Sequence, residues 1–322
     1  MQPRSSIKPL VEGAFAAALA AVLALVGLYV PLLSSIATLV WTVPISILII
    51  RYSLREGLLA LTVTGILVIL LSNPLAAAFY LLQFGLVGIF FGLAFKRQIP
   101  AGYTVLGGIV ISLLSTLTVS WLSLKAMGLS LSDLNQQITN TLEAAFSFYR
   151  SSGILEFYQA RGITEDILRE ATEQMISLLK RLLPGLLAVG AAVTAGVNFG
   201  VVHLVARRLL LPIPKLLPFR EWQMPWYLTW GVVLGFAGLL AGDYFKINGL
   251  MLVGQNLLLF YVPFLVLFGI SVVAFYYHKS QLPSVFKIGL IILSCFYLSI
   301  TLILVMVIGL FDPLFNYRKL TR

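Results

Sequence analysis

The sequence predicts an all-α protein that crosses a membrane eight or nine times, and three observations lead to this fold class. Of its 322 residues, 60% are hydrophobic and only 11% are charged, whereas a water-soluble domain has about a quarter of its residues charged. One helical crossing takes roughly 20 apolar residues, so the chain holds enough for eight or nine. Residues 57–71 and 257–277 are apolar on every face, which indicates helices rather than the alternating strands of a barrel.

Nine apolar runs are candidates for these crossings. They lie near residues 9–30, 33–50, 57–72, 75–95, 103–124, 182–206, 227–243, 252–277 and 285–311. The chain then divides into five segments: the first five spans in 1–124, an amphipathic helical insertion in 125–181, the sixth span in 182–206, an interfacial elbow in 207–226, and the C-terminal spans in 227–322.

The positions of Lys and Arg predict the orientation in the membrane. Cytoplasmic loops carry an excess of these residues, and a cytoplasmic N-terminus places most short-loop cations on that side: Arg4, Lys8, Arg51, Arg55, Lys96, Arg97, Arg207, Arg208, Lys215, Arg220, Lys279 and Lys287. Nine crossings would leave the tail residues Arg318, Lys319 and Arg322 outside, against the same rule. Eight full crossings with a cytoplasmic C-terminus are therefore favoured.

The insertion reads as two amphipathic helices. The first shows apolar residues at three- and four-residue steps, behind a capping box formed by Ser130 and Asp133. The second begins near Thr164, with Glu165 and Asp166 in the first turn, where the helix dipole favours anions. Two arrangements are open: a helical hairpin or lid on the outer face, or two helices lying flat on the lipid interface.

The elbow differs in kind from the membrane spans and from the helical insertion. Its four prolines forbid a continuous helix, and its Trp and Tyr residues suit the headgroup layer of a bilayer. These residues are Pro212, Pro214, Pro218, Pro225, Trp222, Trp226 and Tyr227, followed by Trp230. We expect a boundary between two halves of the protein here.

Composition excludes several kinds of chemistry. Two histidines and one cysteine cannot build a Cys/His metal centre or a disulfide framework. No charged residue lies in the middle of a predicted span, which argues against a proton-driven pump or an intramembrane hydrolase. The chain has no phosphate-binding Gly-x-x-x-x-Gly-Lys loop and no basic run interleaved with stacking aromatics. We expect no catalytic residue, cofactor, metal, nucleic-acid partner or energy source of its own.

Uncharged polar and aromatic groups toward the predicted outer side form the one candidate pocket, suited to a small neutral molecule. They are Tyr29, Ser34, Asn73, Tyr80, Gln83 and Trp121. The alternative for each is a contact between helices or a place in the aromatic belt at the membrane surface.

Small residues recur at four-residue steps in the first span, as Gly13, Ala17 and Ala21 on one stripe and Ala14 and Ala18 on the next. Such stripes let helices approach closely in lipid, so they are either a docking surface for a partner or internal packing. Gly196 and Gly200 repeat the pattern in the sixth span, where internal packing is favoured.

Several of these residues also carry a family resemblance. The first hundred residues resemble the substrate-binding S components of energy-coupling-factor vitamin transporters, through the Ala-rich first helix, the Pro31 turn, Thr42-Val43-Pro44, Arg51 and its basic loop, and Gly85-Leu86-Val87-Gly88. The whole chain resembles the YybS or DUF2232 family of bacterial membrane proteins, which is similar to those components. That match lies in residues 219–225, Asn256, Gly269, residues 309–312, and Arg318-Lys319.

The resemblance implies a six-helix solute-binding core in a bacterial inner membrane, whose first-helix small residues dock on an energy-coupling membrane subunit with ATPases. Gly13, Ala14, Ala17, Ala18 and Ala21 would form that contact. The leading expectation is therefore a transporter-like protein that captures a small molecule. The alternatives are a membrane scaffold of the cell envelope and, as the weakest, a lipid-processing enzyme.

Overall fold

The computed structural model describes residues 7–159 and 161–320, and its regular structure is helical throughout these ranges. Eight segments within them are long and apolar enough to cross a membrane. They are Ile7–Tyr29, Pro31–Arg51, Leu54–Leu71, Ala77–Lys96, Ala101–Ala126, Glu165–Arg208, Asn248–Lys279 and Leu298–Phe315. The predicted all-α membrane fold is confirmed.

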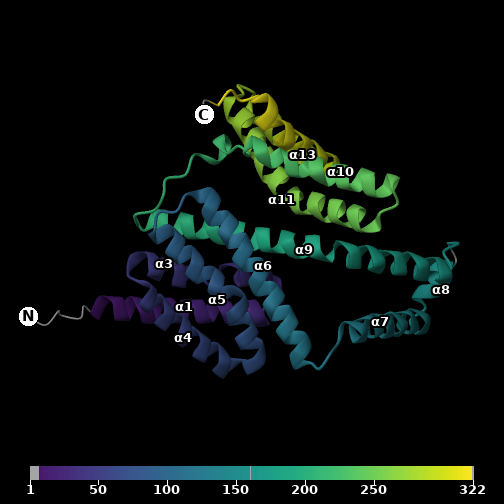
Figure 1. Ribbon diagram of the computed structural model, residues 1–322, viewed down its shortest axis with the longest axis horizontal. Helices are drawn as coiled ribbons and strands as arrows, with labels where there is room; N and C mark the ends of the chain where they lie inside the picture. The colour runs from purple at the N-terminus through teal and green to yellow at the C-terminus, as the bar shows by residue number, and fades with distance from the viewer. Residues whose placement is uncertain (1–6, 160, 321–322) are drawn as a thin grey trace, which may run out of the picture.

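The first six helices form an N-terminal bundle (Figure 1). They are α1 (Ile7–Tyr29), α2 (Pro31–Val40), α3 (Val43–Arg51), α4 (Leu54–Leu71), α5 (Pro74–Lys96) and α6 (Ala101–Ala126). The small side chains of α1 bring it close to α4, where the Thr64 hydroxyl donates to the Ala17 carbonyl at 3.1 Å. Trp41, Ile45 and Ile49 fill the centre of this bundle and are fully buried.

One helix, α9 (Glu165–Arg208), connects the insertion to the membrane bundle. Its 44 residues make a rod of about 66 Å, twice the ~30 Å of a hydrocarbon core. The second insertion helix and the sixth span are therefore one continuous helix, without a boundary at residues 181–182. The second half of the insertion therefore continues the axis of the sixth span. The first half forms α7 (Leu131–Ser151), with the expected Ser130–Asp133 capping box, and the short α8 (Ile154–Gln159).

The chain beyond α9 forms a second group of helices (Figure 1). Residues 209–228 hold only two short 3-10 turns, Phe219–Glu221 and Trp226–Leu228, as the prolines predict. Then follow α10 (Thr229–Tyr244), α11 (Asn248–Lys279), α12 (Ser284–Phe296) and α13 (Leu298–Phe315). The prediction of one span over 285–311 is wrong, because the helix breaks at Tyr297. Gly269 and Gly309 let α11 and α13 touch backbone to backbone: a Cβ on Gly269 would lie 2.0 Å from the Val305 carbonyl oxygen.

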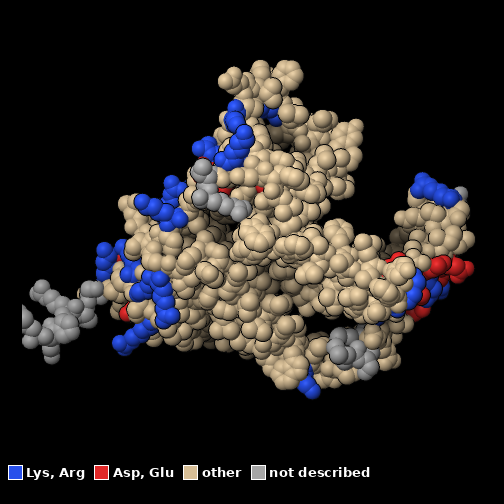
Figure 2. Space-filling view, turned by 45° about the horizontal axis from the view of Figure 1, so that its top comes forward, with Lys and Arg blue, Asp and Glu red and all other residues tan. Residues whose placement is uncertain are grey.

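The break at Tyr297 decides where the tail lies. Lys287 at the start of α12 donates to the Tyr277 carbonyl at the end of α11, and Arg318, beyond α13, donates to the Arg220 carbonyl of the elbow. Both ends of the α12–α13 pair thus lie at the elbow end of the molecule. The same end holds most cations of the short loops, seen on the left in Figure 2. The tail therefore no longer conflicts with the charge rule.

This arrangement predicts the outcome of a cysteine-labelling experiment in a Cys295→Ser background. In intact cells, a membrane-impermeant thiol reagent should label Gln137→Cys and should reach Gln98→Cys and Lys319→Cys only after permeabilisation. Labelling of Gln98→Cys without Gln137→Cys would reverse the orientation. Labelling of Lys319→Cys together with Gln137→Cys would separate the tail from the elbow.

Candidate functional site

The second span is broken at its centre, between α2 and α3. Pro44 follows the break and cannot donate a backbone hydrogen bond. Asn198 of α9 reaches the break from the side: its amide nitrogen donates to the Leu39 carbonyl at 2.8 Å, and its amide oxygen accepts from the Thr42 hydroxyl at 3.1 Å. Because lipid offers no hydrogen bonds, irregular backbone at this depth must be satisfied by protein. Asn198 supplies that partner.

Further uncharged polar groups gather around the break. The Ser46 hydroxyl donates to the Gly88 carbonyl of α5 at 2.7 Å. Gly88 is required for this approach, since a Cβ there would lie 2.6 Å from the Thr42 Cβ. Thr42, Ser46 and Asn198 are at most 2% exposed. Broken helices with polar groups near the bilayer midplane are where many transporters bind their substrates.

Two stacked aromatic rings complete this cluster. Trp41 is 0% exposed, and its ring lies 5.3 Å from that of Tyr80. The Tyr80 hydroxyl sits beside Gly27, where a Cβ would lie 2.5 Å from it and 2.9 Å from the Thr38 hydroxyl. The indole N–H of Trp41 has no acceptor among the described residues. Burying such a donor without a partner costs about 1–3 kcal/mol. A ligand with a hydrogen-bond acceptor would therefore gain the most binding free energy next to this N–H.

Of the six residues predicted for a pocket, Tyr80 alone belongs to this broken-span cluster. Three others form hydrogen bonds to the backbone or between neighbouring helices. Tyr29 donates to the Leu71 carbonyl at 3.1 Å, Asn73 accepts from the Leu75 N–H at 2.9 Å, and Gln83 donates to the Thr116 hydroxyl at 3.5 Å. The first two contacts lie at the ends of α1, α4 and α5, and the third joins α5 to α6.

The last two of the six lie near the surface of the bundle. Ser34 is half-buried on α2, and Trp121 is 59% exposed on α6. Neither of two surface hollows of this chain is lined by any of the six residues. Among the six, Tyr80 lies in a buried cluster with Trp41 and Thr42.

The two small-residue stripes of α1 have different surroundings. Ala17 and Ala21 are buried against the bundle, and Gly13 is half-buried near Leu48, so that stripe packs internally. Ala14 and Ala18, on the adjacent stripe, are exposed. Gly196 and Gly200 of α9 are also exposed, with open space around their Cα atoms. The internal packing expected for these two glycines is wrong.

A second asparagine, the half-buried Asn256, supports α9 next to Pro184. The Asn256 amide oxygen accepts from the Gly185 N–H at 2.6 Å, and its amide nitrogen donates to the Arg181 carbonyl at 2.9 Å. A proline inside a helix disturbs the hydrogen-bond ladder around it. Gly185 leaves space for these two hydrogen bonds, since a Cβ there would lie 2.8 Å from the Asn256 oxygen.

The elbow closes around a buried ion pair. The side chains of Arg318 and Asp312 are 0% and 2% exposed, with 2.7 Å between guanidinium and carboxylate. Arg318 also donates to the Arg220 and Trp222 carbonyls and to the Ser271 hydroxyl at 2.7–2.9 Å. With two bonds to Asp312, all five guanidinium donors have acceptors. We call this set the arginine clamp.

Sequence reasoning assigned no structural role to these polar residues. Asn256 and Arg318 entered through the family resemblance, and Arg318 also as a tail charge. Asn198 was not singled out, although an asparagine within an apolar run was an available signal, since such groups seek a partner in lipid. A metal site is equally absent from the described residues, which hold no group of three His, Cys, Asp or Glu side chains.

The residues of the family resemblance meet in space. Gly269 and Gly309 pack together, Asp312 and Arg318 form the clamp with residues 219–224, and Asn256 supports α9. The family described as "Predicted membrane protein (DUF2232)" matches residues 18–313. This chain belongs to the DUF2232 family. It is similar to "Uncharacterized protein YybS" of Bacillus subtilis, with 25% identity over 97% of this chain and 98% of the relative. No solved structure matches the chain.

The arginine clamp predicts a large loss of stability when one partner is removed. Arg318→Gln leaves the Asp312 carboxylate buried and unpaired, which costs about 3–5 kcal/mol, on the order of 10 °C in Tm. The control Lys319→Gln, at an exposed neighbouring position, should leave Tm unchanged in detergent. The double variant Asp312→Asn/Arg318→Gln should lose less than the sum of the single losses. Equal Tm values for Arg318→Gln and Lys319→Gln would contradict the clamp.

Proposed function

We propose that this member of the DUF2232 family is a solute-binding, transporter-like protein that captures a small neutral molecule beside its broken second span. The observation that carries the proposal is the fully buried indole N–H of Trp41, which has no acceptor and lies against Tyr80 at the break. Buried polar groups almost always have partners. A ligand carbonyl or hydroxyl would supply one.

The surroundings of Trp41 restrict the ligand. Thr42, Ser46 and Asn198 are uncharged, and no Asp, Glu, Lys or Arg is among the buried residues of this bundle. A charged group would meet no counter-charge there, at a cost of several kcal/mol. The ligand would therefore be neutral, with a flat or apolar body against the rings and a hydrogen-bond acceptor near the indole.

The energy for any movement would come from a partner. The sequence contains no nucleotide-binding loop, and the resemblance to S components suggests a coupling subunit with ATPases. The exposed positions Ala14 and Ala18 offer such a subunit a face where two helices could approach closely. By the charge rule, this end of α1 lies toward the cytoplasm, where ATPases would be.

A scaffold of the cell envelope is the second candidate. The observation that favours it is the open face of α9 at Gly196 and Gly200, which a helix of another membrane protein could cover without any solute. Both candidates involve a partner, and only the first requires a ligand.

A thermal-shift screen of neutral metabolites on the purified protein tests the ligand. At 100 times its Kd, a ligand stabilises the fold by ~2.7 kcal/mol, so Tm should rise measurably. Trp41→Phe removes the N–H and should weaken binding about five-fold, as expected for one hydrogen bond. Trp121→Phe, on the outer face of α6, is the matched control. A hit that both variants bind equally well would place the site elsewhere, and a broad screen without a hit would favour the scaffold.

A pull-down in mild detergent tests the partner. Ala14→Leu/Ala18→Leu should keep expression and monodispersity but abolish recovery of the partner, because the added volume separates helices that must nearly touch. Thr62→Leu, at an exposed position of α4, is the matched control. Mass spectrometry that identifies ATPases with a membrane subunit supports transport, whereas cell-wall or division proteins support the scaffold. Unchanged recovery with the double variant would remove the docking role from α1.

A further inference from the structure

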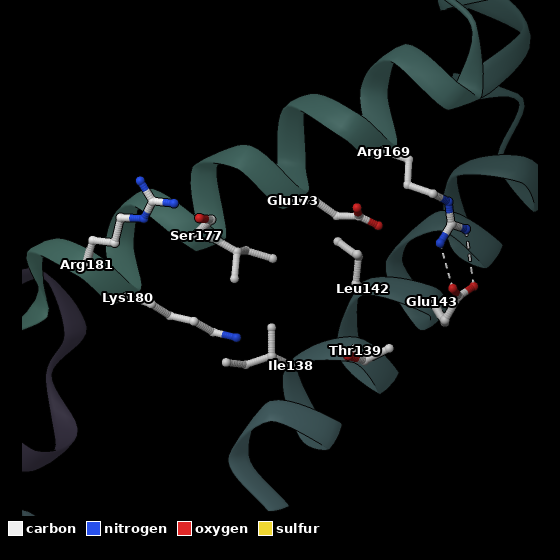
Figure 3. Close-up of a pocket in the computed structure, with 10 residues that line it drawn as sticks. Ile138, Thr139, Leu142, Glu143, Arg169, Glu173, Ser177, Lys180 and Arg181 are labelled. Atoms are coloured by element: carbon white, nitrogen blue, oxygen red, sulfur yellow. Dashed lines mark hydrogen bonds and ion pairs between the residues drawn. The ribbon is translucent and has the colours of Figure 1, made fainter. Parts of the chain in front are cut away.

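The insertion contains a groove between α7 and the projecting part of α9. The two helices are held apart and joined by polar bridges: Arg150 to Glu165 at 2.9 Å, Arg169 to Glu143 at 2.6 Å, and Lys180 to Asn135 at 2.7 Å. The groove between them has a volume of about 600 Å³ (Figure 3). It lies outside the broken-span cluster and does not depend on the function proposed for that cluster.

The residues that line the groove differ in charge between its two ends. Ile138, Leu142 and Ile176 form an apolar wall, and the end nearest the membrane carries Lys180 and Arg181 together. At the other end, Arg169 pairs with Glu143 (Figure 3). The hydrogen bonds and charge of Arg169 hold the pKa of Glu143 below its ordinary value. That carboxylate is therefore ionised at neutral pH, and the bridge weakens only as pH falls through the lowered pKa.

The two cations at the end of the groove nearest the membrane have no carboxylate partner among the described residues. Lys180 bonds to the neutral amide of Asn135, and Arg181 forms no ion pair with a carboxylate of the described residues. Figure 3 shows Lys180 extending from α9 toward Ile138 of α7, whereas Arg181 extends from the other side of α9. One phosphate could bind the Lys180 ammonium, a charge-assisted donor, with Arg181 adding positive charge at the same end of the groove.

The position of this end matches the phosphate layer of a bilayer. The apolar run of the sixth span begins directly after Arg181. Leu183 follows Lys180 by three residues and is its neighbour on the helix surface, and Leu186 is in turn the neighbour of Leu183; both leucines are exposed. A molecule with its phosphate at Lys180 could lay an acyl chain along these leucines into the hydrocarbon core. A soluble anion would make no use of this apolar continuation.

We propose that the groove between α7 and α9 binds the phosphate headgroup of an anionic membrane lipid. The phosphate lies against Lys180, with Arg181 adding positive charge at the same end, the glycerol region contacts Ile138 and Leu142, and the acyl chains follow Leu183 and Leu186 into the membrane. The lipid thereby anchors the projecting hairpin to the bilayer surface.

Lipid retention in detergent tests this site. The protein is incubated with equal amounts of dioleoyl phosphatidylglycerol and dioleoyl phosphatidylcholine, and retained lipid is counted by native mass spectrometry. The wild type should retain phosphatidylglycerol in preference, and Lys180→Gln/Arg181→Gln should reduce this preference at least five-fold. Arg181→Gln keeps the bridge to Asn135 and should reduce it about two-fold. Lys246→Gln, a highly exposed cation in the α10–α11 connection, is the control and should keep it.

Two results would overturn the proposal. Equal preference in the double variant and in Lys246→Gln would show that the groove cations do not select the lipid. A rise in Tm with soluble glycerol 1-phosphate as large as that with phosphatidylglycerol would assign the groove to a soluble anion instead.

Discussion

Every backbone N–H and C=O inside a bilayer needs a partner within the protein, and this requirement shapes the fold wherever a proline interrupts a helix. At three interruptions a side chain distant in the sequence supplies a partner. Asn198 does so at the break of the second span, Asn256 beside Pro184, and Arg318 with Ser271 at the elbow. These hydrogen bonds connect segments that are far apart in the sequence.

The broken second span connects this constraint to function. Thr42 at the break bonds to Asn198 of α9, and Ser46 of α3 bonds to the Gly88 carbonyl of α5. The indole N–H of Trp41 lies next to them without an acceptor among the described residues. Specific binding in this part of the bundle, which has no charged residue among its described buried ones, would come from such uncharged groups.

Sequence patterns were sufficient for the all-helical membrane class and for most of the long apolar helices, because apolar length alone decides which segments can cross a bilayer. The capping box of α7 and the irregular elbow were equally readable from local residues. The division of 285–311 into two helices was not, because no proline or glycine marks Tyr297 and the break depends on the return of the tail to the elbow. The inward and outward stripes of α1 were also indistinguishable, since Ala17 and Ala18 differ only in which neighbour faces them.

The arginine clamp has a consequence for the order of assembly during synthesis. The Trp222 carbonyl is separated from Arg318 by 96 positions, so the ribosome must make α10 to α13 before the elbow can close. Within the N-terminal bundle α1 to α6 can pack on one another as they are made, whereas the Leu39 carbonyl receives its partner only when Asn198, 159 positions later, has been made. The C-terminal half is thus completed late in synthesis. A chain that stops after α11 leaves the Arg220 and Trp222 carbonyls without their Arg318 donor, and a membrane protease could recognise this unfinished segment.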